Sequence, residues 1–136
     1  MVKITGEYLG NLNCKAVHGP SGTTLDTDAP KDNQGRGESF SPTDLVATAL
    51  ATCVVTTWAI VARRHGVELD GVRYEITKEM SAEPPRRIVR LAAQYWLPIK
   101  RDALPAGLLE EVAEKCPVHN SLDAGIQKPV TLHWAE

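Results

Sequence analysis

One uncharged stretch constrains the fold of this sequence more than any other feature. Residues 45–62 form a run of 18 positions without a charged side chain, which approaches the length of a membrane-spanning helix. Threonines are spread through the run, and we interpret it as a helix buried inside a protein. A start signal precedes it, because Ser41 can cap a helix, Pro42 suits the first helical position and Asp44 can complete a capping box. The helix is predicted to continue to about His65, where a glycine follows as a stop.

Strands are predicted on both sides of this helix. Alternating apolar residues bounded by turn residues predict strands over 2–9, 12–18, 23–26, 72–80, 88–97 and 130–134, with the first hairpin turning at Gly10-Asn11. A second helix is predicted to open at Pro105 and to break at Pro117, because proline lacks an N–H and clashes with the preceding turn. A short helical turn is predicted to restart over 118–124. This order predicts a single α+β domain, residues 1–136, with an antiparallel sheet.

Composition and charge argue against several classes of function. The net charge is -2, and no basic run favours binding to nucleic acid or to a membrane surface. Three cysteines at irregular spacing argue against a secreted disulfide framework. The first nine residues mix charged and apolar side chains, unlike a signal peptide. We therefore expect a cytoplasmic protein, in which a pair of cysteines is more often catalytic or metal-binding than structural.

Two cysteines are candidates for thiol chemistry. Cys53 lies in the middle of the apolar helix, where burial makes a thiol inert unless a cation is near. The candidate cation is Arg36, the only arginine that precedes Cys53. It lies in a loop over 29–40, rich in Gly, Pro, Asp and Asn taken together, of a length that is often functional. Cys116 lies where the second helix breaks, and the N–H groups of a restarting helix can stabilise a thiolate. The alternative is that both cysteines are small packed hydrophobes, as we expect for Cys14.

A metal site is the rival interpretation of the same residues. Cys116 and His119 have ligand-like spacing, and Cys53, Cys14 and His18 could complete a tetrahedron. Structural zinc sites usually contain two such close pairs, whereas this sequence has one. We expect no metal and no cofactor, since no glycine-rich phosphate fingerprint is present either.

Several segments resemble the OsmC/Ohr family, which comprises osmotically inducible protein C and organic hydroperoxide resistance protein. Residues 41–53, SPTDLVATALATC, are similar to the family's proline-led helix with its first cysteine. Residues 116–122, CPVHNSL, are similar to its second-cysteine motif. Asp28-Ala29-Pro30 and Gly35-x-Gly37 resemble the OsmC-like branch. The resemblance covers almost the whole chain in the right order.

This resemblance implies a fold and an activity. The fold would be an intertwined homodimer in which strand-rich layers wrap paired central helices. Cys53 would attack an organic hydroperoxide and become a sulfenic acid, and Cys116 would resolve it as a disulfide. A small dithiol, lipoyl-type in the Ohr branch, would restore the thiols without any cofactor. Thiolate nucleophiles and sulfenic acid condensation agree with this scheme.

The long helix also offers apolar side chains for a substrate pocket. We expect some of the following to line it: Leu45, Leu50, Val54, Trp58 and Ile60. Such a pocket suits an alkyl hydroperoxide, because buried methylene groups favour binding. The alternative is a binding module for a small apolar ligand in which the cysteines are idle.

The sequence departs from the Ohr pattern at one position. Thr43 stands where Ohr proteins carry a glutamate that holds the catalytic arginine, and Asp44 follows it. Glu38 is two residues from Arg36 and could orient it through paired hydrogen bonds, whereas Asp44 could be occupied as a helix cap. Which carboxylate orients the arginine stays open, and the alternative is that Arg36 and Glu38 are solvated loop charges.

Overall fold

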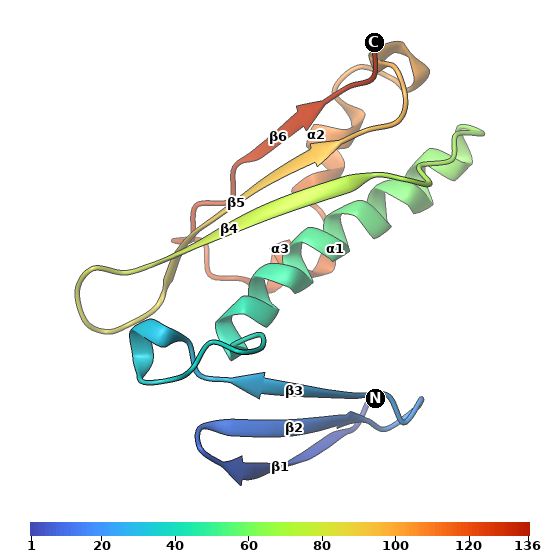
Figure 1. Ribbon diagram of the computed structural model, residues 1–136. Coiled ribbons are helices and arrows are strands. Elements are labelled where there is room, and N and C mark those ends of the chain that lie inside the picture. The colour runs from blue at the N-terminus through green and yellow to red at the C-terminus, as the bar shows by residue number, and fades with distance from the viewer. The chain divides into compact units, whose positions relative to one another are not determined.

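A computed structural model describes residues 1–136, and Figure 1 shows its helices and strands. The chain divides into two compact units, Met1–Val46 and Ala47–Glu136. We describe each unit by itself. The two units are joined within the long helix, which begins at Pro42.

The first unit contains a three-stranded antiparallel sheet. Its strands are β1 (Ile4–Gly10), β2 (Asn13–His18) and β3 (Thr24–Asp28), in the order β1-β2-β3. All three strands were predicted from the sequence. The first hairpin turns at Asn11 and Leu12, which have left-handed φ values of 54° and 64°, and not at Gly10-Asn11. Such a turn matches the right-handed twist of the flanking strands.

One face of this sheet is apolar. The register pairs Tyr8 with Cys14 and Ala16 with Leu25, so these side chains share a face with Ile4. Ile4, Tyr8 and Leu25 are 66%, 64% and 45% exposed. The apolar face of β1-β2-β3 is therefore not covered by any element of the first unit.

The opposite face of the same sheet is polar. Glu7 pairs with Lys15, and Lys15 pairs with Asp26, so charges of both signs alternate across it. Within Met1–Val46 the buried side chains are Asp28 and Ser41, both of which are polar. This unit consequently has an amphipathic sheet but no hydrophobic core of its own.

The loop after β3 leads into α1 (Pro42–Arg64), and it contains a short 3-10 turn at Lys31–Asn33. The Ser41 N–H donates to Asp44 Oδ2 at 2.9 Å, and the Asp44 N–H donates to Ser41 Oγ at 3.1 Å. This reciprocal pair is the predicted capping box. At the other end Gly66 has a φ of 72°, as a C-terminal stop requires. The predicted helix boundaries are confirmed.

Helix α1 is long and apolar enough to cross a membrane by length and composition alone. The core helix of a globular protein passes the same test. Its buried residues recur at helical spacing and are Ala47, Leu50, Ala51, Val54, Trp58 and Ala62. This spacing gives α1 one face that packs inside the protein, as the sequence predicts.

The second unit is a sheet covered on one face by helices. Its strands are β4 (Arg73–Met80), β5 (Ile88–Trp96) and β6 (Val130–His133), in the order β4-β5-β6. Strand β4 pairs with β5 antiparallel, but β6 pairs with β5 parallel. The prediction of a wholly antiparallel sheet is wrong at this pair. Parallel neighbours need a crossover, and the segment between β5 and β6 supplies it.

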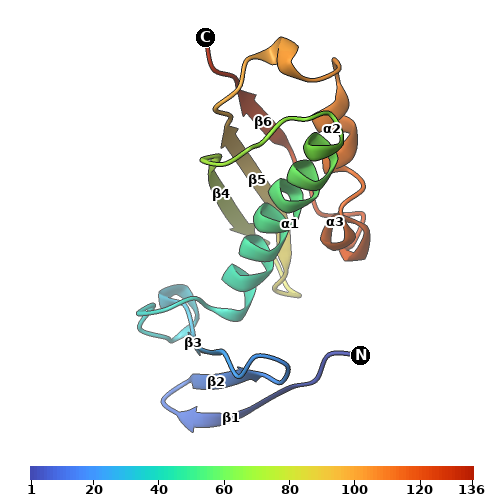
Figure 2. The ribbon, with the colours of Figure 1, turned by 90° about the vertical axis from the view of Figure 1, so that its right-hand side faces the viewer.

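The crossover carries two short helices. A 3-10 turn at Arg101–Ala103 precedes α2 (Leu108–Ala113), and α3 spans Pro117–Ser121. Figure 2 shows α1, α2 and α3 on the same side of β4-β5-β6. The second helix begins at Leu108 rather than at Pro105, and the predicted break at Pro117 is confirmed. Together these elements form the α+β fold expected from the sequence.

Buried aromatic side chains join the layers of the second unit. The Tyr95 hydroxyl on β5 donates to the Ala51 carbonyl of α1 at 3.0 Å. Trp58 Nε1 on α1 donates to the Leu109 carbonyl of α2 at 2.7 Å. The Trp58 and Tyr95 rings meet edge to face with centroids 4.5 Å apart. These contacts fix α1 against the sheet and against the helix that leads to Cys116.

Candidate active site

Cys53 and Cys116 occupy different positions in the second unit. Cys53 lies in the middle of α1 and is half-buried. Cys116 is fully buried and caps α3, since its Sγ accepts the His119 N–H at 3.3 Å. Pro117 forms the first position of α3 and ends the preceding turn. The sequence therefore places the second sulfur at a helix start, as predicted.

The fold brings these two thiols together. Burial raises the pKa of the Cys116 thiol, and the hydrogen bond and charge of Cys53 raise it further. The N–H groups of His119 and Val118 act in the opposite direction. Both cysteines are free thiols. Two sulfurs within hydrogen-bonding reach are placed to form a disulfide once one of them is oxidised.

Tyr95 is a neighbour of this pair that the sequence analysis missed. Burial raises the pKa of its hydroxyl, and Cys116, Tyr74 and Cys53 act in the same direction. The hydroxyl stays neutral and is engaged with the Ala51 carbonyl. Alternation within β5 predicts that Tyr95 faces inward, but not that it lies beside two cysteines from other elements.

A cavity of about 240 Å³ lies in the second unit; neither Cys53 nor Cys116 lines it, but Val54, next to Cys53 in the chain, and Tyr95 do. Its apolar lining comes from α1, β5, α2 and the start of β6, and consists of Leu50, Val54, Leu91, Ala93, Tyr95, Ala113, Pro129 and Val130. Its polar lining consists of Glu110, Glu114, His119 and Lys128. The cavity is thus apolar within and carries charged groups as well, an arrangement typical of small-molecule sites.

The predicted pocket residues are only partly found in this cavity. Leu50 and Val54 line it, and they flank Cys53 on the helix. Trp58 instead belongs to the core, and Ile60 is 53% exposed. Leu45 is half-buried near the start of α1 and is not among the lining residues. Helical spacing explains the exposure of Ile60, because positions 50, 54 and 58 share one face of α1 and position 60 lies opposite.

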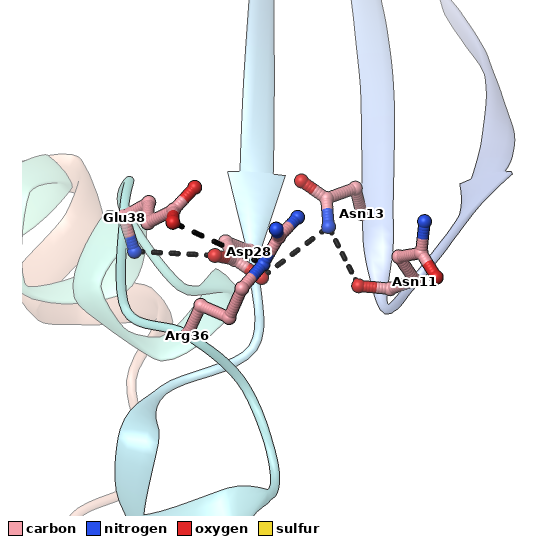
Figure 3. A network of polar contacts seen from close by, with 5 residues as sticks. All are labelled: Asn11, Asn13, Asp28, Arg36 and Glu38. Atoms are coloured by element: carbon pink, nitrogen blue, oxygen red, sulfur yellow. Dashed lines mark hydrogen bonds and ion pairs between the residues drawn. The ribbon is translucent and has the colours of Figure 1, made fainter.

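Arg36 and Glu38 lie in the first unit, in the loop before α1. The Arg36 Nε and Glu38 Oε1 atoms are 4.0 Å apart, with side chains 62% and 65% exposed. Figure 3 shows this pair beside Asp28 and Asn13. The structure thus brings the predicted arginine and glutamate together, but exposed pairs of this kind stabilise a fold little. Asp44 is engaged in the capping box.

No cluster of three or more His, Cys, Asp or Glu side chains is arranged to hold a metal ion. His119 contacts Cys116 through its backbone N–H. Cys14 is exposed on the sheet of the first unit. His18 Nδ1 lies 2.6 Å from the Ser21 hydroxyl.

Asp28 is a second residue that the sequence analysis did not single out for chemistry. It is the last residue of β3 and is 1% exposed. Its side-chain oxygens accept hydrogen bonds from the loop that carries Arg36 and from Asn13. The sequence gives only a weak signal for this burial, because an acidic residue at a strand end is usually exposed.

Comparisons with known proteins agree with this fold. The family model described as OsmC-like protein matches residues 35–130. A protein of Psychrobacter arcticus, named as a candidate osmotic stress induced and detoxification response protein, is 36% identical. Its crystal structure superposes with a TM-score of 0.89 over 98% of this chain and 96% of that one. A comparison with curated protein sequences finds no match.

More distant structures share the fold. An organic hydroperoxide resistance protein of Legionella pneumophila is 18% identical, with a TM-score of 0.77 over 98% of this chain and 96% of that chain. A Vibrio cholerae protein, named as a candidate organic hydroperoxide resistance protein with captopril in one active site, is 21% identical. Its TM-score is 0.76 over 97% of this chain and 90% of that chain. The two cysteine motifs, the α+β fold and the family match together lead to one conclusion: this chain belongs to the OsmC-like protein family.

Proposed function

We propose that the protein is a thiol-dependent peroxidase that reduces organic hydroperoxides. The observation that carries the proposal is the pair of neighbouring thiols, Cys53 and Cys116, in a unit that also contains a mostly apolar cavity. Two relatives that share the fold bear the name organic hydroperoxide resistance protein. A peroxidase that forms an internal disulfide needs two neighbouring thiols, and Cys53 and Cys116 meet this requirement.

The reaction divides between the two cysteines. The Cys53 thiolate attacks the distal peroxide oxygen, the O–O bond breaks, and the alcohol leaves after taking a proton, with Cys53 as sulfenic acid. The Cys116 sulfur then attacks the Cys53 sulfur, which forms a disulfide and releases water. A small dithiol of the lipoyl type returns the pair to thiols and becomes a disulfide itself. Burial keeps Cys116 protonated until it acts, so Cys53, the less buried of the two, is the better first nucleophile.

Cys53 needs a cation to react as a thiolate in the middle of an apolar helix. We assign this role to Arg36, with Glu38 orienting its guanidinium. The 4.0 Å contact between them supports the assignment. An arginine on a loop leading directly into α1 is suited to approach a cysteine of that helix.

The cavity supports a preference for organic hydroperoxides over hydrogen peroxide. A volume of about 240 Å³ with Leu50 and Val54 in its wall accommodates a compact alkyl or aryl group. Each buried methylene contributes about 0.8 kcal/mol, so a four-carbon group could favour binding by about 3 kcal/mol. Hydrogen peroxide gains none of this.

We further propose that two copies form an obligate homodimer. The apolar face of β1-β2-β3 carries Ile4, Tyr8 and Leu25 and is exposed in one chain. Large exposed apolar faces in globular proteins mark association sites, and obligate interfaces typically exceed about 2,000 Å². A second copy would complete the core that the first unit lacks and make residues 1–136 one cooperative domain. Light scattering at low micromolar concentration should give the dimer mass, and a stable, active monomer would contradict this.

The decisive experiment is a peroxidase assay with tert-butyl hydroperoxide, first with dithiothreitol and then with dihydrolipoamide as reductant. Cys53→Ser should abolish turnover. Cys116→Ser should consume about one peroxide per site and stop at the sulfenic acid. Cys14→Ser is the matched control and should retain full activity. Sulfenic acid on Cys116 of a fully active Cys53→Ser variant would reverse the roles.

A second candidate function is a binding module for a small apolar ligand, favoured by the same cavity. In that case tert-butyl hydroperoxide is not consumed. An apolar fluorescent probe binds to the protein, and Val54→Phe weakens this binding. We also propose that the protein acts in the cytoplasm, where a thiol reductant is at hand.

A further inference from the structure

The loop that carries Arg36 is held by a buried carboxylate. Asp28, at the end of β3, is 1% exposed. Its Oδ2 accepts the backbone N–H of Glu38 at 3.1 Å, and its Oδ1 accepts Asn13 Nδ2 at 3.4 Å. Asn13 Nδ2 also donates to the Asn11 carbonyl at 2.6 Å. Figure 3 shows these contacts as one network from the β1–β2 turn to Glu38 and Arg36. A buried carboxylate is costly, so its contacts call for an explanation.

The backbone on both sides of Arg36 is fixed to the same strand end. The Gly37 N–H donates to the Ala29 carbonyl at 3.2 Å, and the Asp28 N–H donates to the Phe40 carbonyl at 3.1 Å. A Cβ at Gly35 would lie 1.7 Å from the Ala29 oxygen, so only glycine fits there. The loop is therefore held rigidly by its backbone.

The arginine side chain on this fixed loop is largely accessible, at 62% exposed. Nothing in the contacts of the loop requires a guanidinium for folding. A rigid backbone with an exposed charged side chain is the arrangement expected where the side chain is presented to another group.

We propose that Asp28 is a positioning residue for the activating arginine, an inference that rests on the proposed role of Arg36. Asp28 holds the backbone of Glu38, and the Glu38 carboxylate meets the Arg36 guanidinium. The arginine is thereby oriented from the strand side of the loop. Asp28 thus supplies support for a chain that has Thr43 at the start of its helix.

The test measures the reactivity of Cys53 without relying on turnover. All variants carry Cys14→Ser and Cys116→Ser, so that Cys53 is the only thiol. The midpoint of pH-dependent alkylation by iodoacetamide and the rate of the first reaction with tert-butyl hydroperoxide are recorded. A urea midpoint accompanies each variant. The substitutions are Asp28→Asn, Asp28→Ala, Arg36→Ala and the double variant Asp28→Ala/Arg36→Ala.

The matched control is Asp26→Asn, which removes the same charge from the same strand. Asp26 is exposed, and Ser39 contacts its backbone carbonyl rather than its carboxylate. This variant should leave both readouts unchanged. Asp28→Asn preserves the shape of the side chain, so it reports even if Asp28→Ala folds poorly.

A nearby cation lowers a thiol midpoint by roughly 1–3 pH units. We expect Arg36→Ala to raise the alkylation midpoint by about 1 unit or more and to slow oxidation about tenfold or more, since each unit is a tenfold change in thiolate below the midpoint. Asp28→Ala should reproduce most of this change, and Asp28→Asn a smaller part of it. Adding Asp28→Ala to Arg36→Ala should then have almost no further effect on either readout, although the urea midpoint falls in both backgrounds.

Other results would overturn the inference. If Asp28→Ala slows oxidation by the same factor with and without Arg36, the residue acts only through folding. If Asp28→Ala or Arg36→Ala leaves the alkylation midpoint unchanged, no positioning role remains. Failure of the peroxidase proposal is distinguishable, since the parent would then not react with the hydroperoxide while its alkylation midpoint could still be read.

Discussion

Trp58→Phe tests whether one buried indole joins the two cysteine-bearing parts of the second unit. Trp58 is fully buried, its Nε1 donates to the Leu109 carbonyl at 2.7 Å, and its ring meets Tyr95. Helix α2 leads from Leu109 towards Cys116. Phenylalanine keeps an aromatic ring against Tyr95 but loses the N–H and part of the buried surface.

The cost can be worked from these contacts. A buried hydrogen bond of this kind contributes about 1 kcal/mol. Full truncation of a buried tryptophan costs about 3–5 kcal/mol, so loss of the second ring alone should cost about 1–2 kcal/mol. The sum is about 2–3 kcal/mol. With a urea m value of about 2 kcal/mol per molar, the unfolding midpoint should fall by about 1 M.

Urea unfolding followed by circular dichroism measures this at fixed protein concentration. Trp96→Phe is the matched control, because Trp96 is half-buried and stacks on His133 with centroids 5.0 Å apart. Arg73 lies over its ring at 5.6 Å. Loss of part of such contacts should cost under about 1 kcal/mol. Equal midpoints for Trp58→Phe and Trp96→Phe would refute the assigned role of the Leu109 contact.

Three further predictions concern the cysteine pair and the cavity. Burial raises the pKa of Tyr95, so the folded protein keeps this proton while an unfolded tyrosine loses it near pH 10. The free energy of unfolding should therefore fall as the pH rises above about 10. Tyr95→Phe should make the urea midpoint depend less on pH in this range, and it should cost about 1 kcal/mol at neutral pH. Because burial and Cys53 raise the pKa of Cys116, iodoacetamide at pH 8 should alkylate Cys116 more slowly in the native protein than in the urea-unfolded protein, and equal rates by mass spectrometry would contradict the burial argument. Val54→Phe should fill part of the cavity and lower kcat/KM for cumene hydroperoxide at least tenfold more than for hydrogen peroxide, a ratio equivalent to about 1.4 kcal/mol. An equal loss for both peroxides would show that the cavity does not bind the organic group of the substrate.

Local signals in the sequence account for most of the secondary structure. The capping box of Ser41 and Asp44 and the glycine after the helix set both ends of α1, because these interactions join residues only a few positions apart. The break at Pro117 follows from the missing N–H of proline. The direction of β6 could not be read in this way, because the pairing of distant strands depends on the crossover between them.

The sequence by itself determined the α+β class and the long buried helix, and it marked Cys53 and Cys116 as candidates for thiol chemistry. Only the tertiary structure decided which groups surround them. The meeting of the two thiols with Tyr95 requires α1, β5 and the start of α3 to pack together. The burial of Asp28 requires the loop to fold back over the end of β3. Local patterns record periodicity and capping, whereas contacts between distant residues arise only when apolar faces pack and close the chain upon itself.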